Sequence, residues 1–172
     1  MQDLKSKESE EINVTEEENQ FVTFSIGGET YGVSVLKVQE IIGMTQITHV
    51  PNTLKYLKGV INLRGSVVPV IDMRLKFEMP KREYDSFTVI IIVEVEDRLI
   101  GMIIDSVSDV LSIPVTAIQE VPHFSSKIES DFIESIGQKG DELIIILDVG
   151  RVISIEELNE LGNVKSEVEN NK

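Results

Sequence analysis

Three aspartates that each follow an apolar stretch are the residues of this sequence best placed to do chemistry: Asp72, Asp105 and Asp148. Two carboxylates held a few ångströms apart can share acid–base work, so Asp72 with Asp105 is the candidate pair of a small hydrolase. Such a site would need one water-filled cleft and a raised carboxyl pKa. A carboxylate at the end of a strand is more often a turn or cap residue, and Gly-x-Ser-x-Gly does not occur. We therefore expect that the protein is not an enzyme.

Metal, thiol and phosphate chemistry are poorly represented in the chain. The two histidines, His49 and His123, are far apart, and no ligand spacing supports a metal site at either. A zinc site made by both histidines and a carboxylate is the alternative. Cysteine is absent, which excludes disulfides and cysteine nucleophiles, and the phosphate loop Gly-x-x-x-x-Gly-Lys-Ser/Thr is absent too. We expect neither a metal nor another cofactor.

The charge balance argues against nucleic acid as a partner. The 172 residues carry 30 Asp and Glu against 16 Lys and Arg, a net charge of −14, and the basic residues are scattered. Such a chain repels a phosphate backbone. The first 20 residues have no apolar signal core, and no stretch of about 18 apolar residues exists. These features predict a cytoplasmic protein with no direct membrane insertion.

Short apolar runs separated by polar turns predict a mostly β structure. Three hairpins are expected, over residues 21–35, 60–73 and 87–104, and a further strand over residues 143–149. Short helical turns are expected near residues 51–53 and 114–116. Ser154 and Glu157 form a capping box, which predicts a short C-terminal helix over residues 154–161.

The sequence also aligns with itself. With Gly32 placed over Gly101, apolar and acidic positions coincide as far as Ile42 and Leu111, and Arg64-Gly65 falls over Lys139-Gly140. Any β protein rich in Ile and Val aligns with itself to some degree, but the matched glycines and acids favour a real repeat. We expect two similar β subdomains, each a small closed barrel because closure removes exposed edges, with a docking groove between them.

The predicted domain limits follow from this repeat and from composition. The folded part runs over residues 20–162, with subdomains at about residues 20–85 and 86–153 that can exchange strands. Residues 1–19 form an acidic disordered tail and residues 163–172 a flexible tail, because both are polar and highly charged.

Several motifs carry a resemblance to a known family. Asn62-Leu63-Arg64-Gly65, the run at residues 68–74 and the segments at residues 31–41, 59–62 and 105–111 resemble the CheW family of bacterial chemotaxis coupling proteins. The resemblance extends over about residues 21–161. No one motif is specific, but their order and spacing together are.

The resemblance implies two SH3-like five-stranded β-barrel subdomains with a hydrophobic groove between them. It implies a non-catalytic adaptor of two-component signalling, which couples the cytoplasmic hairpin tips of chemoreceptors (methyl-accepting chemotaxis proteins) to the regulatory domain of the histidine kinase CheA. Such a protein is a monomer in isolation and can join rings within membrane-associated arrays. A CheV-like adaptor or a detached kinase regulatory domain is the alternative, and a stand-alone adaptor is favoured.

The resemblance also assigns site residues. The positions implied in receptor binding are Val35, Val38, Gly59, Val107 and Val110. Those implied in kinase binding are Met44, Ile47 and Phe124. For each of these apolar residues, plain core packing is the alternative.

Glu40 and Arg64 match nearly fixed family positions and have two interpretations. Either they contact the receptor, or they form an ion pair that braces the groove, and the brace is favoured because a guanidinium can bond a carboxylate twice. If the pair is buried, Arg64→Ala is predicted to lower both thermal stability and receptor coupling.

Overall fold

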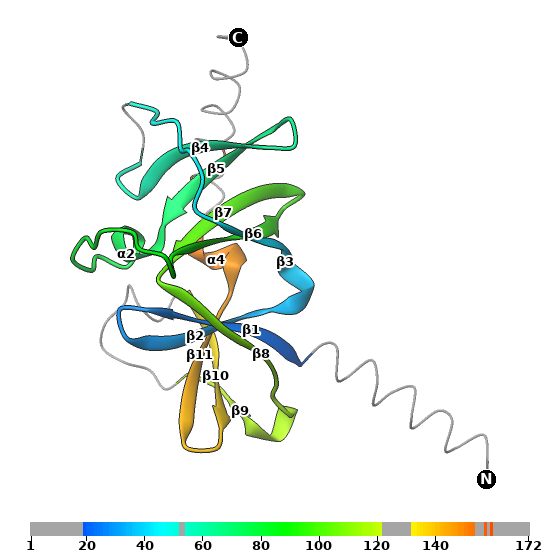
Figure 1. Ribbon diagram of the computed structural model, residues 1–172. Helices are drawn as coiled ribbons and strands as arrows, with labels where there is room; N and C mark the ends of the chain where they lie inside the picture. Colours follow the sequence, from blue (N-terminus) through cyan, green and yellow to red (C-terminus); the bar gives the residue numbers. More distant parts are fainter. Residues whose placement is uncertain (1–18, 52–53, 122–131, 154–156, 158, 160–172) are drawn as a thin grey trace.

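The computed structural model describes residues 19–51, 54–121, 132–153, 157 and 159. The described chain is mostly β and forms two sheets, one above the other in the view of Figure 1. The upper sheet has five strands in the order β3-β6-β7-β5-β4, and the lower has six in the order β8-β1-β2-β11-β10-β9. None of the helices in this part of the chain is long and apolar enough to cross a membrane.

The six-stranded sheet contains β1 (Gln20–Ile26), β2 (Glu29–Ser34), β8 (Ser106–Ser112), β9 (Ile118–Gln119), β10 (Ile133–Lys139) and β11 (Glu142–Leu147). The five-stranded sheet contains β3 (Val38–Gly43), β4 (Leu57–Leu63), β5 (Ser66–Asp72), β6 (Val89–Val95) and β7 (Arg98–Ile104). Short helical turns are η1 (Val35–Lys37), α2 (Met73–Lys76), η2 (Val115–Ala117) and α4 (Val149–Val152).

The same strand plan occurs twice. The hairpins β1–β2 and β6–β7 are both antiparallel, and their second strands each take a parallel partner, β11 and β5. Strand β5 ends at Asp72 and β11 ends just before Asp148, and the side chains of these two aspartates cap α2 and α4. The third strand of each half pairs with the hairpin of the other half, because β3 joins β6 and β8 joins β1. Each sheet therefore contains strands from both halves of the sequence.

The three predicted hairpins are present, and so is the helical turn after Pro114. The strand predicted over residues 143–149 ends at Leu147, because Asp148 starts α4. Strands β3, β8, β9 and β10 were not predicted. The helical turn near residues 51–53 lies mostly outside the described residues, as do the tails, and of the predicted C-terminal helix only Glu157 and Asn159 are described, both helical.

Both sheets are strongly curved. Thr48, just after β3, makes an isolated bridge to Val60 of β4, so the two ends of the five-stranded sheet approach each other. In the other sheet, β9 follows β8 along the chain and pairs with β10. The five-stranded sheet matches the expected strand number and the other has one strand more. Closure into barrels stays a prediction.

The main core lies between the two sheets. It joins side chains of both, among them Phe24 and Ile26 of the six-stranded sheet and Ile91 and Met102 of the five-stranded sheet, all fully buried. Apolar contacts of this kind stabilise the pair of sheets without fixing one orientation. Two smaller clusters cover other sheet faces, one around Ile90 and one around Ile113.

Candidate functional site

Strands β3 and β8 are the edge strands of their respective sheets, and both carry apolar side chains into solvent. The turn η1 contacts both β1 and β6, the strands next to β8 and β3. We call the outward side of these elements the β3–β8 surface, formed by Leu36, Val38, Ile41, Val107 and Val110. An edge strand has unpaired backbone groups, so apolar residues there favour pairing or docking with another chain.

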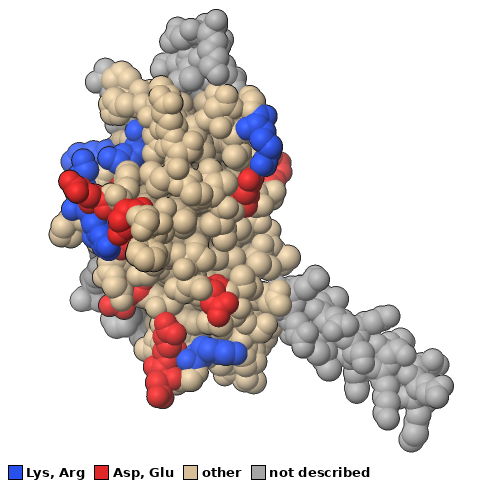
Figure 2. Space-filling view, viewed as in Figure 1, with Lys and Arg blue, Asp and Glu red and all other residues tan. Residues whose placement is uncertain are grey.

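Four aliphatic side chains of this surface are exposed to solvent. The exposed fractions are 59% for Leu36, 41% for Ile41, 37% for Val107 and 53% for Val110. Figure 2 shows a broad, largely uncharged area in the middle of this face, where β8 crosses in Figure 1. Val35 and Val38 are half-buried and pack against the main core. Exposed apolar side chains that gather on one face favour a role in contact with another protein.

The motif Asn62-Leu63-Arg64-Gly65 forms the turn between β4 and β5. The Asn62 Oδ1 accepts a hydrogen bond from the Gly65 amide at 2.8 Å. Arg64 and Gly65 have φ values of 51° and 88°, the left-handed conformation that a tight two-residue hairpin turn requires. Strands β4 and β3 stand at opposite ends of the strand order, yet the turn brings the Arg64 side chain beside Glu40 of β3.

There Arg64 forms a two-armed ion pair with Glu40. Its Nη1 and Nη2 donate to Oε1 and Oε2 of Glu40 at 3.0 and 2.6 Å. The hydrogen bond from Arg64 holds the pKa of the Glu40 carboxyl below its usual value. The Arg64 side chain is 73% exposed and that of Glu40 28%. The pair is thus a surface feature, and the energetics expected of a buried pair do not apply to it.

Arg64→Ala is therefore expected to leave the melting temperature nearly unchanged, because exposed ion pairs contribute little to stability. The earlier expectation of lowered stability depended on burial, which the structure does not have. A thermal unfolding scan of Arg64→Ala beside Glu40→Gln checks this. A drop of many degrees in either variant would show that the pair braces the fold.

Gly59 lies away from the β3–β8 surface. It is a buried residue of β4 with a φ of 151°, and a side-chain carbon there would meet Ile47 and the carbonyl of Thr48. Met44 and Ile47 follow β3 and are half-buried against the cluster around Ile90. The structure thus brings Gly59 and Ile47 together. Phe124 lies outside the described residues.

The proposed hydrolase pair is held in ways that do not suit catalysis. Asp72 is buried, and its carboxylate accepts hydrogen bonds from the Arg74 and Leu75 amides and from the Tyr84 hydroxyl. The Arg74 side chain donates to both oxygens of Asp105, at 2.8 and 2.7 Å. That bonding lowers the pKa of the Asp105 carboxyl, opposite to the shift that a general acid needs. The two carboxylates serve as a cap and as an ion-pair partner.

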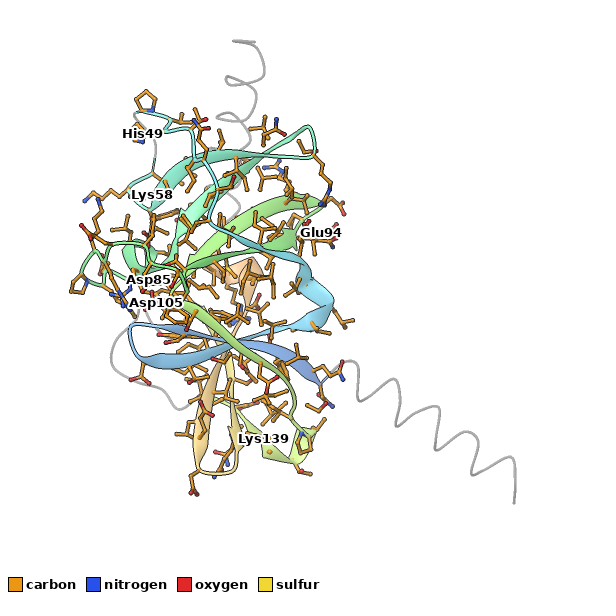
Figure 3. All side chains as sticks on the ribbon, in the orientation of Figure 1. His49, Lys58, Asp85, Glu94, Asp105 and Lys139 are labelled. Atoms are coloured by element: carbon orange, nitrogen blue, oxygen red, sulfur yellow. The ribbon has the colours of Figure 1, made fainter. Side chains whose placement is uncertain are left out.

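A metal centre finds no support in the described part of the chain, where no group of three or more His, Cys, Asp or Glu side chains could hold an ion. His49 is exposed in the loop between β3 and β4, at the upper left of Figure 3. His123 lies outside the described residues.

Two features of the site were not found from sequence. Ile41 is one of the exposed apolar residues of β3, and its neighbour Glu40 was the only member of that strand singled out beside Val38. The pairing of Arg74 with Asp105 joins residues 31 positions apart. Ile41, Arg74 and Asp105 all lie in segments that resemble the family. The sequence therefore pointed to these segments but not to how the side chains are arranged in space.

The described residues define a two-sheet β protein with apolar side chains exposed along two edge strands, a surface typical of the class of proteins that bind other proteins. Comparisons with known proteins agree. The family model "CheW-like domain" matches residues 20–157. The "Chemotaxis protein CheW" of Klebsiella aerogenes is 39% identical over 145 residues, 84% of this chain and 87% of that protein.

A second relative, the "Chemotaxis protein CheW" of Bacillus subtilis, is 35% identical over 135 residues, 78% of this chain and 86% of its own. The crystal structure of the scaffolding protein TtCheW from Thermoanaerobacter tengcongensis is similar with a TM-score of 0.75 and 33% identity, and covers 81% of this chain and 94% of that one. The chain belongs to the CheW family of chemotaxis scaffold proteins, a non-catalytic family.

Proposed function

We propose that this protein is a cytoplasmic coupling adaptor that links the cytoplasmic hairpin tips of chemoreceptors to the regulatory domain of the histidine kinase CheA. Membership of the CheW family supports the role. The observation that carries it is the exposed apolar β3–β8 surface, because an adaptor needs docking area and no reactive groups. The protein is recruited to membrane-associated receptor arrays through this contact, as a monomer that can also join rings.

The receptor site is the β3–β8 surface. An amphipathic helix presents apolar side chains along one stripe and docks by laying that stripe into an apolar groove. Val107 and Val110 supply such a surface from β8, and Val38 and Ile41 supply it from β3. Val35 supports the surface from below because it packs on the core.

Glu40 and Arg64 lie at the rim of the receptor site. Their exposure supports a role as contacts more than as a brace. A rim charge pair contributes to partner selection and association rate more than to affinity. Gly59, buried beside Thr48, supports the fold and acts on receptor binding only through it.

The kinase site is the loop after β3 that contains Met44 and Ile47, together with Phe124. Both loop side chains are half-buried and pack against the cluster around Ile90. This face of the five-stranded sheet is therefore partly apolar. This site is separate from the β3–β8 surface, so that both partners can be held at once.

Val110→Asp is expected to weaken receptor binding at least about tenfold, because a desolvated carboxylate in an apolar interface costs more than 1.4 kcal/mol. The melting temperature should change little, since Val110 is 53% exposed. Leu143→Asp is the matched control, because Leu143 is 61% exposed on β11 of the same sheet, three strands away from β8.

Co-sedimentation with receptor fragments that contain the hairpin tip measures both variants. Equal pelleting of Val110→Asp and the parent protein would remove the β3–β8 surface as the receptor site. Equal loss in both variants would show that a charged residue anywhere on the six-stranded sheet disturbs binding.

A further inference from the structure

Asp105 is the single residue between β7 and β8, at the point where the chain passes from the five-stranded sheet to the six-stranded sheet. Its backbone amide donates to the Ser25 carbonyl at 3.0 Å, and its Oδ2 accepts from the Gly27 amide at 2.9 Å. Ser25 belongs to β1 and Gly27 to the turn that follows it. Asp105 is therefore bonded to the six-stranded sheet through both its main chain and its side chain.

The same carboxylate is bonded to α2, the turn that follows the last residue of β5 in the five-stranded sheet. Arg74 belongs to α2, directly after β5, and its guanidinium grips Asp105 with Nε at 2.8 Å and Nη2 at 2.7 Å. The remaining guanidinium nitrogen, Nη1, donates to the Pro80 carbonyl at 3.2 Å, which further restrains the orientation of the guanidinium. The Arg82 Nη1 lies 3.6 Å from the same carboxylate. Both members are well shielded, with 18% of Arg74 and 13% of Asp105 exposed.

The ion pair between Asp105 and Arg74 is directional, unlike the apolar contacts of the core between the sheets. Apolar contacts tolerate sliding and rotation, whereas a two-armed guanidinium–carboxylate pair holds only in one plane and at one separation. Figure 3 shows Asp105 beside Asp85 at the side of the molecule, where the two sheets meet. Fixing this junction fixes the angle between the sheets.

The β3–β8 surface depends on that angle. Its β3 half moves with the five-stranded sheet, because β3 pairs with β6, and its β8 half moves with the six-stranded sheet, because β8 pairs with β1. Val107, the second residue of β8, is only two residues from Asp105 along the chain. A change in the Asp105–Arg74 pair therefore alters the shape of the β3–β8 surface, without any change in the side chains that line it.

We propose that Asp105, held by Arg74, is a positioning residue that sets the angle between the two sheets and thereby the shape of the receptor-docking surface. The part of this proposal that concerns the receptor rests on the proposed function. The part that concerns the sheets does not.

Distances between spin labels test the angle in the full chain. The absence of cysteine allows two labels to be introduced at Ser66→Cys on β5 and Ser108→Cys on β8, two exposed positions on different sheets. Pulsed electron–electron double resonance on the labelled parent protein should give one narrow distribution of distances between the two labels. Asp105→Asn in this background should broaden or shift it, because the charged grip of Arg74 is lost.

Asp148→Asn is the matched control. It removes the same charge from the carboxylate that caps α4, where the side chain accepts from the Gly150 amide and lies 3.4 Å from the Arg151 Nε, both within that turn. It should leave the label distance unchanged. Arg74→Lys keeps the positive charge but cannot donate two parallel hydrogen bonds to Asp105, so it should broaden the distance distribution less than Asp105→Asn does. This variant provides an independent test if Asp105→Asn folds poorly.

Receptor affinity measured on the unlabelled variants completes the test, with an expected loss of fivefold or more for Asp105→Asn, on the order of typical coupling between sites. An unchanged distance distribution in both Asp105→Asn and Arg74→Lys would overturn the proposal. So would an altered distance with unaltered receptor affinity, or an equal shift in Asp148→Asn. If the parent itself fails to bind the receptor, the proposed function fails, and the distance result still decides the role of Asp105 in the fold.

Discussion

Replacing Gly59 by alanine is expected to destabilise the protein by about 4 kcal/mol, the sum of a strained backbone and a close contact that cannot relax. A β-carbon at this position would approach the Thr48 carbonyl oxygen far inside van der Waals contact and would lie 2.9 Å from an Ile47 methyl group. The φ of 151° is itself unfavourable for any residue with a side chain. The Thr48–Val60 bridge, with hydrogen bonds of 2.8 and 2.9 Å, would have to open.

Denaturant unfolding of Gly59→Ala beside Gly28→Ala measures the effect. Gly28 also has a positive φ, of 86°, but a β-carbon there would meet nothing within 4 Å. The control variant should therefore lose only the conformational cost, about 1 kcal/mol. If both variants lost the same stability, the close approach of Thr48 would not be what requires glycine at position 59, and direct contact with a partner would become the better explanation.

Arg74→Ala is expected to cost about 3 kcal/mol, because it leaves the shielded Asp105 carboxylate without its main partner. For a domain of this size that corresponds to roughly 6–12 °C in melting temperature. The effect depends on pH in a defined direction. Because Arg74 lowers the pKa of Asp105 in the native state, the pair stabilises the fold above the ordinary carboxyl value of about 3.9, and this stabilisation is lost as the pH falls through the native value.

Melting curves of the parent and of Arg74→Ala between neutral and acid pH check both statements. The gap between the two proteins should be widest near neutral pH and should narrow below about pH 4. Arg82→Ala is the control, since Arg82 is 54% exposed and lies 3.6 Å from Asp105. A gap that stays constant down to the acid limit would show that Arg74 acts through packing and not through its charge.

The hairpins could be predicted from sequence because their signals are local. Gly27-Gly28 and Arg64-Gly65 supply the positive φ values that tight turns need, and the flanking runs alternate or are wholly apolar. Asp72 and Asp148 were correctly interpreted as cap residues for the same reason, since each bonds to amides only two or three residues ahead.

Strands β3 and β8 were missed because they lie at sheet edges. Each has one strand as a neighbour, and their side chains are mostly exposed or half-buried, so the apolar alternation that marks a half-buried strand is weak. The proposed docking surface is formed by these same two strands. Because its side chains are exposed, the surface lacks the burial pattern by which its strands could have been recognised.

The exposure of the Glu40–Arg64 pair could not be predicted either. The resemblance to the family identifies both positions, and the turn at residues 62–65 can be derived from Asn62 and Gly65. How far the turn carries Arg64 towards β3 depends on the curvature of the whole five-stranded sheet. That curvature follows from contacts between distant segments, such as Thr48 with Val60, which no local pattern specifies.

Kinase activity in a reconstituted mixture tests the coupling role most directly. Receptor fragments in an array-like assembly, the kinase CheA and this protein are combined, and phosphorylation of CheA is measured with and without the protein. We predict that receptor control of the kinase requires the protein, that Val110→Asp supports this control poorly and that Leu143→Asp binds the receptor normally. Equal kinase activation with the protein omitted would contradict the coupling role.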